Sequence, residues 1–145
     1  MQFLLPIVVV LAVGDSSSAE GDKRYGQAVD LKKYPQETAK AALGSFIKAV
    51  ENKDIEYFAA QLADPKFVDQ RVKDLGGHFD DVVKEATQKL VDDPATLKLL
   101  KRLAEDGEWK TSDDTATLKL KDAPDKALSF VKRGERWFVE NRYGR

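Results

Sequence analysis

The chain contains no cysteine, only one histidine, and almost equal numbers of acidic and basic residues among its 145. The absence of cysteine excludes disulfide bonds, thiolate metal sites and cysteine nucleophiles. With 25 acidic and 24 basic residues there is no basic excess for phosphate contacts, so we expect no nucleic-acid partner. One histidine among scattered acidic residues gives no metal-ligand spacing, and no cofactor motif is present. We therefore expect neither a metal nor a cofactor.

Long apolar runs are also missing, apart from residues 3–13. That run is too short to span a bilayer as a helix. Small and polar residues follow it, and residues 17–19 match the small-x-small pattern that signal peptidase cleaves. We predict a signal peptide over residues 1–19, export to the periplasm or the medium, and no stable membrane span after cleavage. The alternative is a buried N-terminal strand.

Residues 20–35 are polar and have little to bury, which is typical of a flexible leader. Pro35 suits the first turn of a helix, where its missing N–H costs nothing. The composition is 42% hydrophobic and 34% charged, which fits one globular core. We therefore predict a single domain over residues 36–143.

Apolar side chains after Pro35 recur at spacings of three and four, which predicts a series of helices. Asp54 is placed to cap the second helix. Asp64-Pro65 and Asp93-Pro94 are typical of helix starts, and Gly107 is placed to end the last helix. The apolar face of the first helix consists of Leu43, Phe46, Ile47 and Val50.

The period changes from helical to alternating after the last of these helices. Residues 116–121 alternate apolar and polar side chains, and residues 108–110 are a candidate for a short extra strand. Residues 128–143 hold two aromatic and β-branched runs around a polar turn at Gly134, which predicts a β-hairpin. Helices first and strands last predict an α+β fold with N-terminal helices packed on a curved antiparallel sheet.

Both ends of the predicted domain share an order of elements with a known superfamily. Residues 42–65 give a helix, a polar break centred on Asp54, and a second helix that ends near Asp64-Pro65. Residues 128–141 give a hairpin with a glycine turn followed by Trp137. This arrangement resembles the NTF2-like (cystatin-like, SnoaL-like) superfamily, and the resemblance implies a cone-shaped α+β domain. It implies no activity, because that superfamily holds isomerases, dehydratases, transport factors and many non-enzymatic domains.

His78 is the first candidate for chemistry. It precedes Asp80 and Asp81, so an imidazole and a nearby carboxylate could form a general acid–base pair. The alternative is a solvated helix start, where acidic side chains favour the helix dipole without any chemistry. We favour the helix start.

Aromatic residues are the second candidate. Tyr57, Trp109, Trp137 and Tyr143 could line an apolar cavity with a few polar tips, as ligand pockets do. Strand alternation puts Asn141 on the same side as Trp137, so its amide could point inward. The alternative, which we favour, is that the aromatic rings simply form the core.

Trp137 is the residue on which the predicted packing depends. We expect its ring to lie against the first helix near Phe46 and Val50, and we expect Arg136 beside it to contribute little to stability. A basic group surrounds it on the hairpin, and such a group could meet an acidic partner or prevent edge-to-edge aggregation. Its members are Lys132, Arg133, Arg136 and Arg142.

The function predicted from these observations is binding. We expect an exported, non-catalytic NTF2-like domain that binds a small apolar ligand or a partner protein. One alternative is a small lyase or isomerase with an acid–base pocket inside the cone. Another is a structural module that forms a homodimer through its exposed sheet face. Desolvated carboxylates in a cavity would favour the enzyme, and a filled core would favour the structural module.

Overall fold

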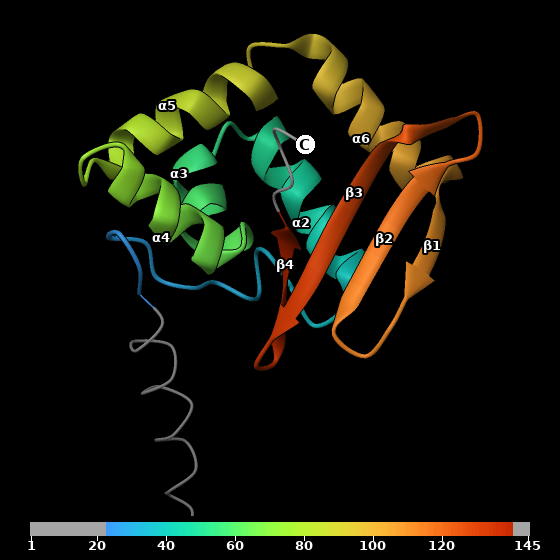
Figure 1. Cartoon of the computed structure of the whole chain (residues 1–145), viewed down its shortest axis with the longest axis horizontal. Coiled ribbons are helices and arrows are strands. Elements are labelled where there is room, and N and C mark those ends of the chain that lie inside the picture. The colour runs from blue at the N-terminus through green and yellow to red at the C-terminus, as the bar shows by residue number, and fades with distance from the viewer. Residues whose placement is uncertain (1–22, 141–145) are drawn as a thin grey trace, which may run out of the picture.

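We describe residues 23–140 of the chain in a computed structural model. They form an α+β protein in which helices precede a curved antiparallel sheet, as predicted (Figure 1). The helical elements are α2 (Ala39–Glu51), α3 (Ile55–Tyr57), the π-helix η1 (Phe58–Leu62), α4 (Pro65–Asp74), α5 (Phe79–Leu90) and α6 (Pro94–Asp106). The strands pair in chain order and are β1 (Glu108–Thr111), β2 (Thr115–Leu120), β3 (Ala123–Arg133) and β4 (Arg136–Glu140).

Two helix starts follow the predicted aspartate–proline signal. The Asp64 carboxylate accepts a hydrogen bond from the Lys66 N–H at 3.3 Å, and Pro65 occupies the first turn of α4. The Asp93 carboxylate accepts from the Ala95 N–H at 3.0 Å at the start of α6. In both helices the cap satisfies an N–H that has no partner within the helix, and this stabilises the start by about 1 kcal/mol.

The start of α2 differs from the prediction. The helix begins at Ala39, and its cap is Thr38, whose hydroxyl accepts from the Ala41 N–H at 2.9 Å. Pro35 lies before the helix, and its carbonyl accepts a hydrogen bond from the Ser45 hydroxyl at 2.7 Å. A threonine cap therefore overrides the proline signal here.

Asp54 also differs from its predicted role. It stands at the cap position of α3 but makes no side-chain capping bond. Its carboxylate instead accepts a hydrogen bond from the Tyr34 hydroxyl at 2.8 Å. The aspartate thus ties a segment from before α2 to the break that follows α2.

Residues 23–36, which we call the N-terminal strap, pack on the domain. Tyr34 is 1% exposed and its ring stacks on Tyr57 at 4.6 Å between centroids. The Arg24 guanidinium donates to the Ala60 carbonyl at 2.9 Å and pairs with Asp69 at 2.7 Å. The prediction of a flexible leader is therefore wrong for residues 23–35. The predicted signal peptide lies outside the described residues.

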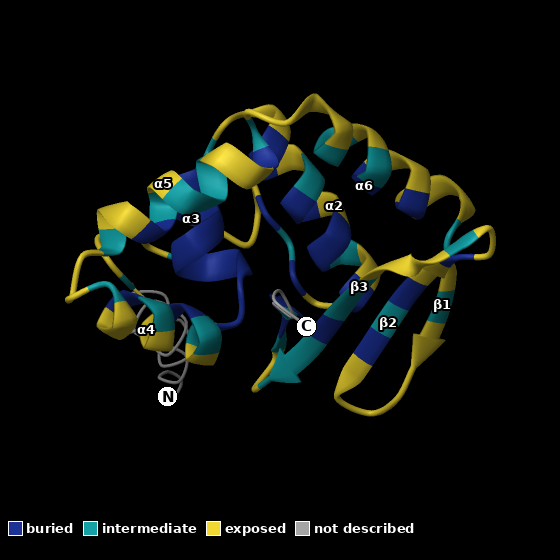
Figure 2. Ribbon diagram, turned by 45° about the horizontal axis from the view of Figure 1, so that its top comes forward, coloured by how far each residue is buried: buried dark blue, intermediate teal, exposed yellow. Residues whose placement is uncertain are grey.

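The core cluster includes α2 and one face of the sheet, and it extends to the other helices (Figure 2). Alternation along β2 buries Ala116, Leu118 and Leu120, as predicted. Ala116 pairs with Phe130 on β3, and Phe130 pairs with Val139 on β4, so a continuous apolar row crosses the sheet. Each fully buried Leu or Phe side chain contributes about 1.5–3 kcal/mol through removal from water. We call this the inner face of the sheet.

Gly107 joins the last helix to the sheet, as predicted. A methyl group there would lie 2.5 Å from both the Leu103 carbonyl oxygen and a methyl carbon of Leu118. No such contact is tolerated, so the close approach of α6 to β2 requires glycine. Because β1 begins at the next residue, Gly107 also fixes the position of Trp109 in the sheet.

A group of polar side chains, which we call the polar seam, fastens β4 to distant parts of the chain. The Trp137 N–H donates to the Gln36 carbonyl at 2.9 Å, and the Gln36 amide donates back to the Trp137 carbonyl at 2.8 Å. The Arg136 guanidinium donates to the carbonyl and the side-chain oxygen of Gln61, both at 2.9 Å. The members of the polar seam are Gln36, Gln61, Asp64, Arg133 and Arg136.

Arg133 completes the polar seam through a two-point contact with Asp64, at 2.7 and 3.1 Å. The Asp64 N–H also donates to the Val139 carbonyl at 2.9 Å. Arg133 and Arg136 therefore bind groups within the chain, whereas the sequence suggested that they could meet an acidic partner or prevent edge-to-edge aggregation. Arg142, predicted as part of that group, lies outside the described residues.

Candidate ligand-binding site

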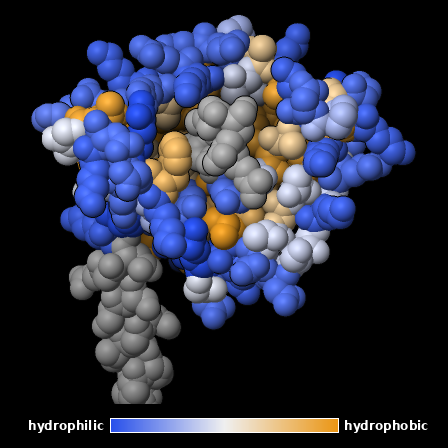
Figure 3. Space-filling view, viewed as in Figure 1, coloured by the Kyte–Doolittle hydropathy of each residue, from blue (hydrophilic) through white to orange (hydrophobic). Residues whose placement is uncertain are grey.

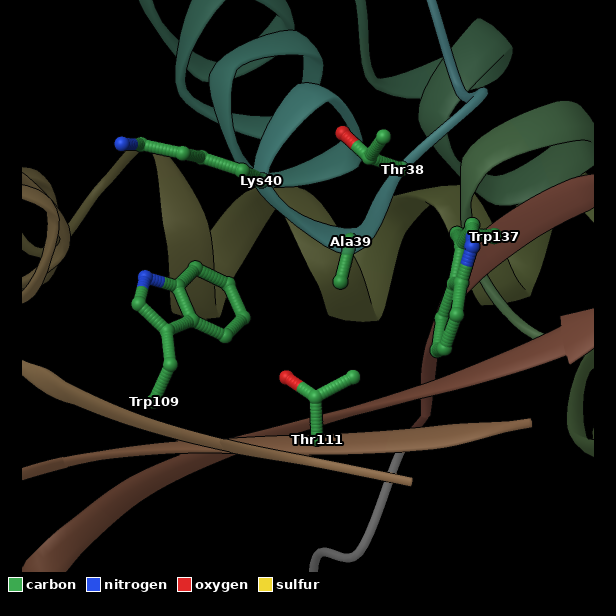
Figure 4. Close-up of a pocket in the computed structure, with 6 residues that line it drawn as sticks. All are labelled: Thr38, Ala39, Lys40, Trp109, Thr111 and Trp137. Atoms are coloured by element: carbon green, nitrogen blue, oxygen red, sulfur yellow. The ribbon is translucent and has the colours of Figure 1, made fainter. Parts of the chain in front are cut away.

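A cavity of about 310 Å³ opens where the start of α2 faces the sheet (Figure 4). We call it the tryptophan pocket, because both tryptophans of the chain line it. Its lining residues are Thr38, Ala39, Lys40, Trp109, Thr111 and Trp137. The structure thus brings together two of the residues that the sequence suggested for a ligand cavity.

Strand β1 supplies one side of the tryptophan pocket. Trp109 and Thr111 lie two residues apart, so alternation puts both on one face of the strand. They pair with Leu118 and Ala116, which are buried, and this identifies the inner face. The Trp109 ring lies 5.5 Å from the ring of Phe130 in a tilted arrangement, which holds it upright beside the cavity.

Trp137 supplies the opposite side. It is 7% exposed. Its backbone N–H donates to the Gln36 carbonyl, and its carbonyl accepts from the Gln36 side-chain amide. Figure 4 shows the methyl group of Ala39 and the side chain of Thr111 between the two indole rings. Because Ala39 is small, the first turn of α2 leaves space there instead of filling it.

Strand β4 packs on α2, as predicted, and Trp137 belongs to the same buried cluster as Phe46 and Val50. Its ring lines the tryptophan pocket together with Thr38 and Ala39, at the start of the helix. Val139, the next inward-facing residue of β4, instead lines a separate cavity together with Phe46.

The walls of the tryptophan pocket are mostly apolar, and we call the side on which the exposed Lys40 lies its mouth. The Thr38 and Thr111 hydroxyls and the Lys40 side chain supply the polar atoms, and Lys40 is exposed. The Thr38 oxygen already accepts from the Ala41 N–H, so it is available mainly as a donor. Among the described residues that line the pocket there is no carboxylate. The arrangement suits an apolar body with a hydrogen-bond acceptor or a negative charge at one end.

A larger cavity of about 800 Å³, which we call the α6 groove, lies between α6 and strands β2 to β4. Its apolar lining residues are Phe46, Leu90, Leu99, Leu100, Leu103, Ala127, Leu128 and Val139. Its polar ones are Lys89, Thr96, Thr117, Lys119, Asp125, Lys126, Ser129 and Glu140. Figure 3 shows hydrophobic atoms gathered around the middle of an otherwise hydrophilic face. Glu140, which is among these lining residues, is the last residue that the structure describes.

The predicted acid–base candidates lie away from both cavities. His78 is exposed at the cap position of α5, where its side chain makes no capping bond. Asp80 and Asp81 are exposed in the first turn of the same helix. None of the three lines the tryptophan pocket or the α6 groove. Their geometry is that of a solvated helix start.

Tyr57 belongs to the core and does not line the tryptophan pocket. Its ring is buried against Tyr34, and its hydroxyl accepts a hydrogen bond from the Asp30 N–H at 2.8 Å. Burial raises the pKa of Tyr57 above its usual value. Asn141 and Tyr143, the other predicted lining residues, lie outside the described residues.

The carboxyl groups with displaced pKa values are those paired with arginine. Burial acts to raise the pKa of Asp69, but hydrogen bonds from Arg24 and Tyr25 outweigh it and lower the pKa. The hydrogen bond from Arg71 lowers the pKa of Glu85. A general acid at neutral pH needs a raised pKa, so these groups are structural anions. Within residues 23–140, no cluster of three or more His, Cys, Asp or Glu could hold a metal ion.

Searches of family models, curated proteins and solved structures found no match to this chain. The site must therefore be judged on its own geometry. Over residues 23–140, no helix has the length and apolar character needed to cross a membrane.

Proposed function

We propose that this chain is an exported, non-catalytic domain that binds a small apolar molecule in the tryptophan pocket. The observation that carries the proposal is the pair of indole rings on opposite sides of a cavity that Ala39 borders from α2 and Thr111 from β1. Ligand pockets combine apolar and aromatic walls with a few polar groups, and about 310 Å³ is at the small end of their usual range. A ligand of one or two rings suits that volume.

The alternatives receive less support. An acid–base enzyme would need a desolvated carboxylate in a cavity, but none lines the tryptophan pocket. In the α6 groove, Asp125 is exposed and Glu140 is only half-buried. A purely structural module would be expected to fill its interior, whereas both cavities remain between helices and sheet. A protein partner and a homodimer remain alternatives for the α6 groove and the outer sheet face.

The NTF2-like identity is part of the same proposal. Helices packed on a curved antiparallel sheet, with a glycine turn before Trp137, support it. Export rests on the apolar run at residues 3–13 and the cleavage pattern at residues 17–19. N-terminal sequencing of the protein from its native host should begin near Glu20, and an intact Met1 would contradict export.

Tryptophan fluorescence tests the binding proposal directly, because the only two tryptophans both line the cavity. The probe is 4-bromobenzyl alcohol, a neutral ring whose bromine quenches indole fluorescence on contact. We expect saturable quenching of the wild type, with the same affinity by calorimetry. Quenching that rises linearly without saturation would overturn the proposal.

A matched pair of variants locates the binding. Ala39→Leu fills the space between the two rings and should weaken binding at least tenfold. Ala104→Leu makes the same change at an exposed position on α6 that lines neither cavity, and it should bind like the wild type. Equal binding by both variants would place the probe elsewhere. Circular dichroism checks that both are folded.

A further inference from the structure

We propose that the tryptophan pocket selects aromatic anions, meaning a flat apolar ring that carries a carboxylate or a similar negative group. This inference rests on the proposed function, because it names the chemical class of the ligand at the same site. Its basis is the combination of an apolar cavity with one charged lining residue, Lys40, at the mouth.

Lys40 is available to a ligand. Its side chain is exposed, and among the described residues no ion pair or hydrogen bond engages its ammonium group. Two lysines of the described chain form ion pairs, Lys101 with Glu51 at 2.8 Å and Lys121 with Glu108 at 3.4 Å, whereas Lys40 does not. No negative group of the described lining competes for Lys40. A carboxylate at the mouth would therefore find a cation that the protein has not already neutralised.

The geometry connects this charge to the ring site. Figure 4 shows the Lys40 stem leaving the first turn of α2 toward the Trp109 side of the cavity. A ring that lies against the α2 side of Trp109 would place a negative substituent toward Lys40, which extends along that side. The first N–H groups of a helix and its positive dipole end act in the same direction as the lysine charge.

Other ligand classes fit less well. A neutral sugar stacks on indole but needs acceptors as well as donors, and the described lining offers no carboxylate or amide side chain. A cationic ring could face the indoles but would meet the ammonium group of Lys40 at the mouth. The same residues that make the pocket apolar inside therefore make it selective for negative charge at its rim.

The test compares three probes of nearly equal shape: 4-bromobenzoate, 4-bromobenzyl alcohol and 4-bromobenzylammonium. We expect the wild type to bind the benzoate about threefold to fivefold more tightly than the alcohol at low salt, as for one exposed charge pair. The ammonium probe should bind most weakly. The preference should shrink as salt is raised, because an exposed pair is screened.

Variants of Lys40 assign the preference. In Lys40→Gln the difference between benzoate and alcohol should disappear, and in Lys40→Glu the ammonium probe should become the better ligand. The matched control is Lys98→Gln, an exposed lysine on α6 that lines neither cavity, which should keep the wild-type preference.

Each outcome decides one question. Equal binding of benzoate and alcohol by the wild type, or a preference that survives in Lys40→Gln, overturns this inference and leaves the proposed function standing. Failure of all three probes to bind the wild type overturns the proposed function and this inference together.

Discussion

Trp137 and Arg136 are neighbours in sequence on strand β4, yet the surroundings of the two side chains are opposite in kind. Trp137 faces the inner side and lines a cavity together with residues at the start of α2. Arg136 faces the other way, bonds to Gln61 and Gln36, and lies over the Phe138 ring at 4.8 Å. The inner side is stabilised mainly by burial of apolar surface, whereas the polar seam is stabilised mainly by hydrogen bonds.

This difference has an energetic consequence. A truncated apolar side chain loses its transfer free energy and leaves a cavity, in proportion to its size. Truncation of a polar side chain costs little transfer free energy, but it leaves its buried hydrogen-bond partners unsatisfied. Gln61 is 0% exposed and accepts from Arg136, so part of the cost of losing Arg136 falls on Gln61. The variants below test each side of β4 in turn.

The largest effect is expected for Trp137→Ala. The ring is nearly fully buried, so its removal should lower the free energy of unfolding by about 3–5 kcal/mol. Urea denaturation followed by circular dichroism measures the change. A variant that unfolds at the urea concentration of the parent would show that the ring is not part of the core.

Arg136→Ala should come next, at about 1–3 kcal/mol, because Gln61 and Gln36 lose a buried donor. This replaces the sequence-based expectation that the change would be nearly silent. The matched control is Arg102→Ala, which breaks an exposed pair with Asp122 and should melt close to the parent. Identical melting of the two variants would mean that the polar seam contributes nothing.

Asp69→Asn removes the carboxylate that pairs with Arg24 of the strap, and its effect on stability should depend on pH. Because the folded state lowers the pKa of Asp69, its stabilisation is present above the usual value of 3.8 and is lost as the pH falls through the lowered value. The variant should therefore melt slightly below the wild type at pH 7, and the gap should close as the pH falls below about 3.8. A gap that is constant with pH would exclude the Arg24 pair as its cause.

His78→Ala should have the smallest effect, under roughly 1 kcal/mol, because the side chain is exposed and makes no capping bond. Ligand quenching in the tryptophan pocket should be unchanged. Loss of binding in a folded His78→Ala protein would favour a role for this residue in the site.

Much of the fold could be predicted because its signals are local. Asp64-Pro65, Asp93-Pro94 and Gly107 mark helix boundaries through contacts within a few residues. Alternation in residues 116–121 identifies the buried face of β2 without knowledge of its partner. Gly134, with a φ of +65°, forms the turn that the hairpin pattern required.

The strap and the polar seam could not be predicted, because their signals are not local. Tyr34 and Arg24 find partners that are 20 and 45 positions away. Nothing next to Arg136 in the sequence distinguishes a buried, bonded guanidinium from an exposed one. An interpretation from composition therefore places the strap and the arginines of the polar seam at the surface.

The candidate site was predicted in part. Trp109 and Trp137 were selected for their chemistry, and the structure places both at one cavity. Ala39, Lys40 and Thr111 were missed, because their importance comes only from the way that α2 meets the sheet. The available signal was Thr38, a capping residue just before the apolar periodicity, which would have placed the helix start beside the cavity.

The link between Gln36 and Trp137 spans 101 positions of sequence and has a consequence for the order of events during synthesis. A ribosome releases the strap and α2 long before it makes β4. Until then the Gln36 amide lacks its Trp137 carbonyl, and Gln61 lacks its Arg136 donor. Closing such distant contacts carries a large entropic cost that local helices do not share. The domain therefore closes only after β4 has left the ribosome.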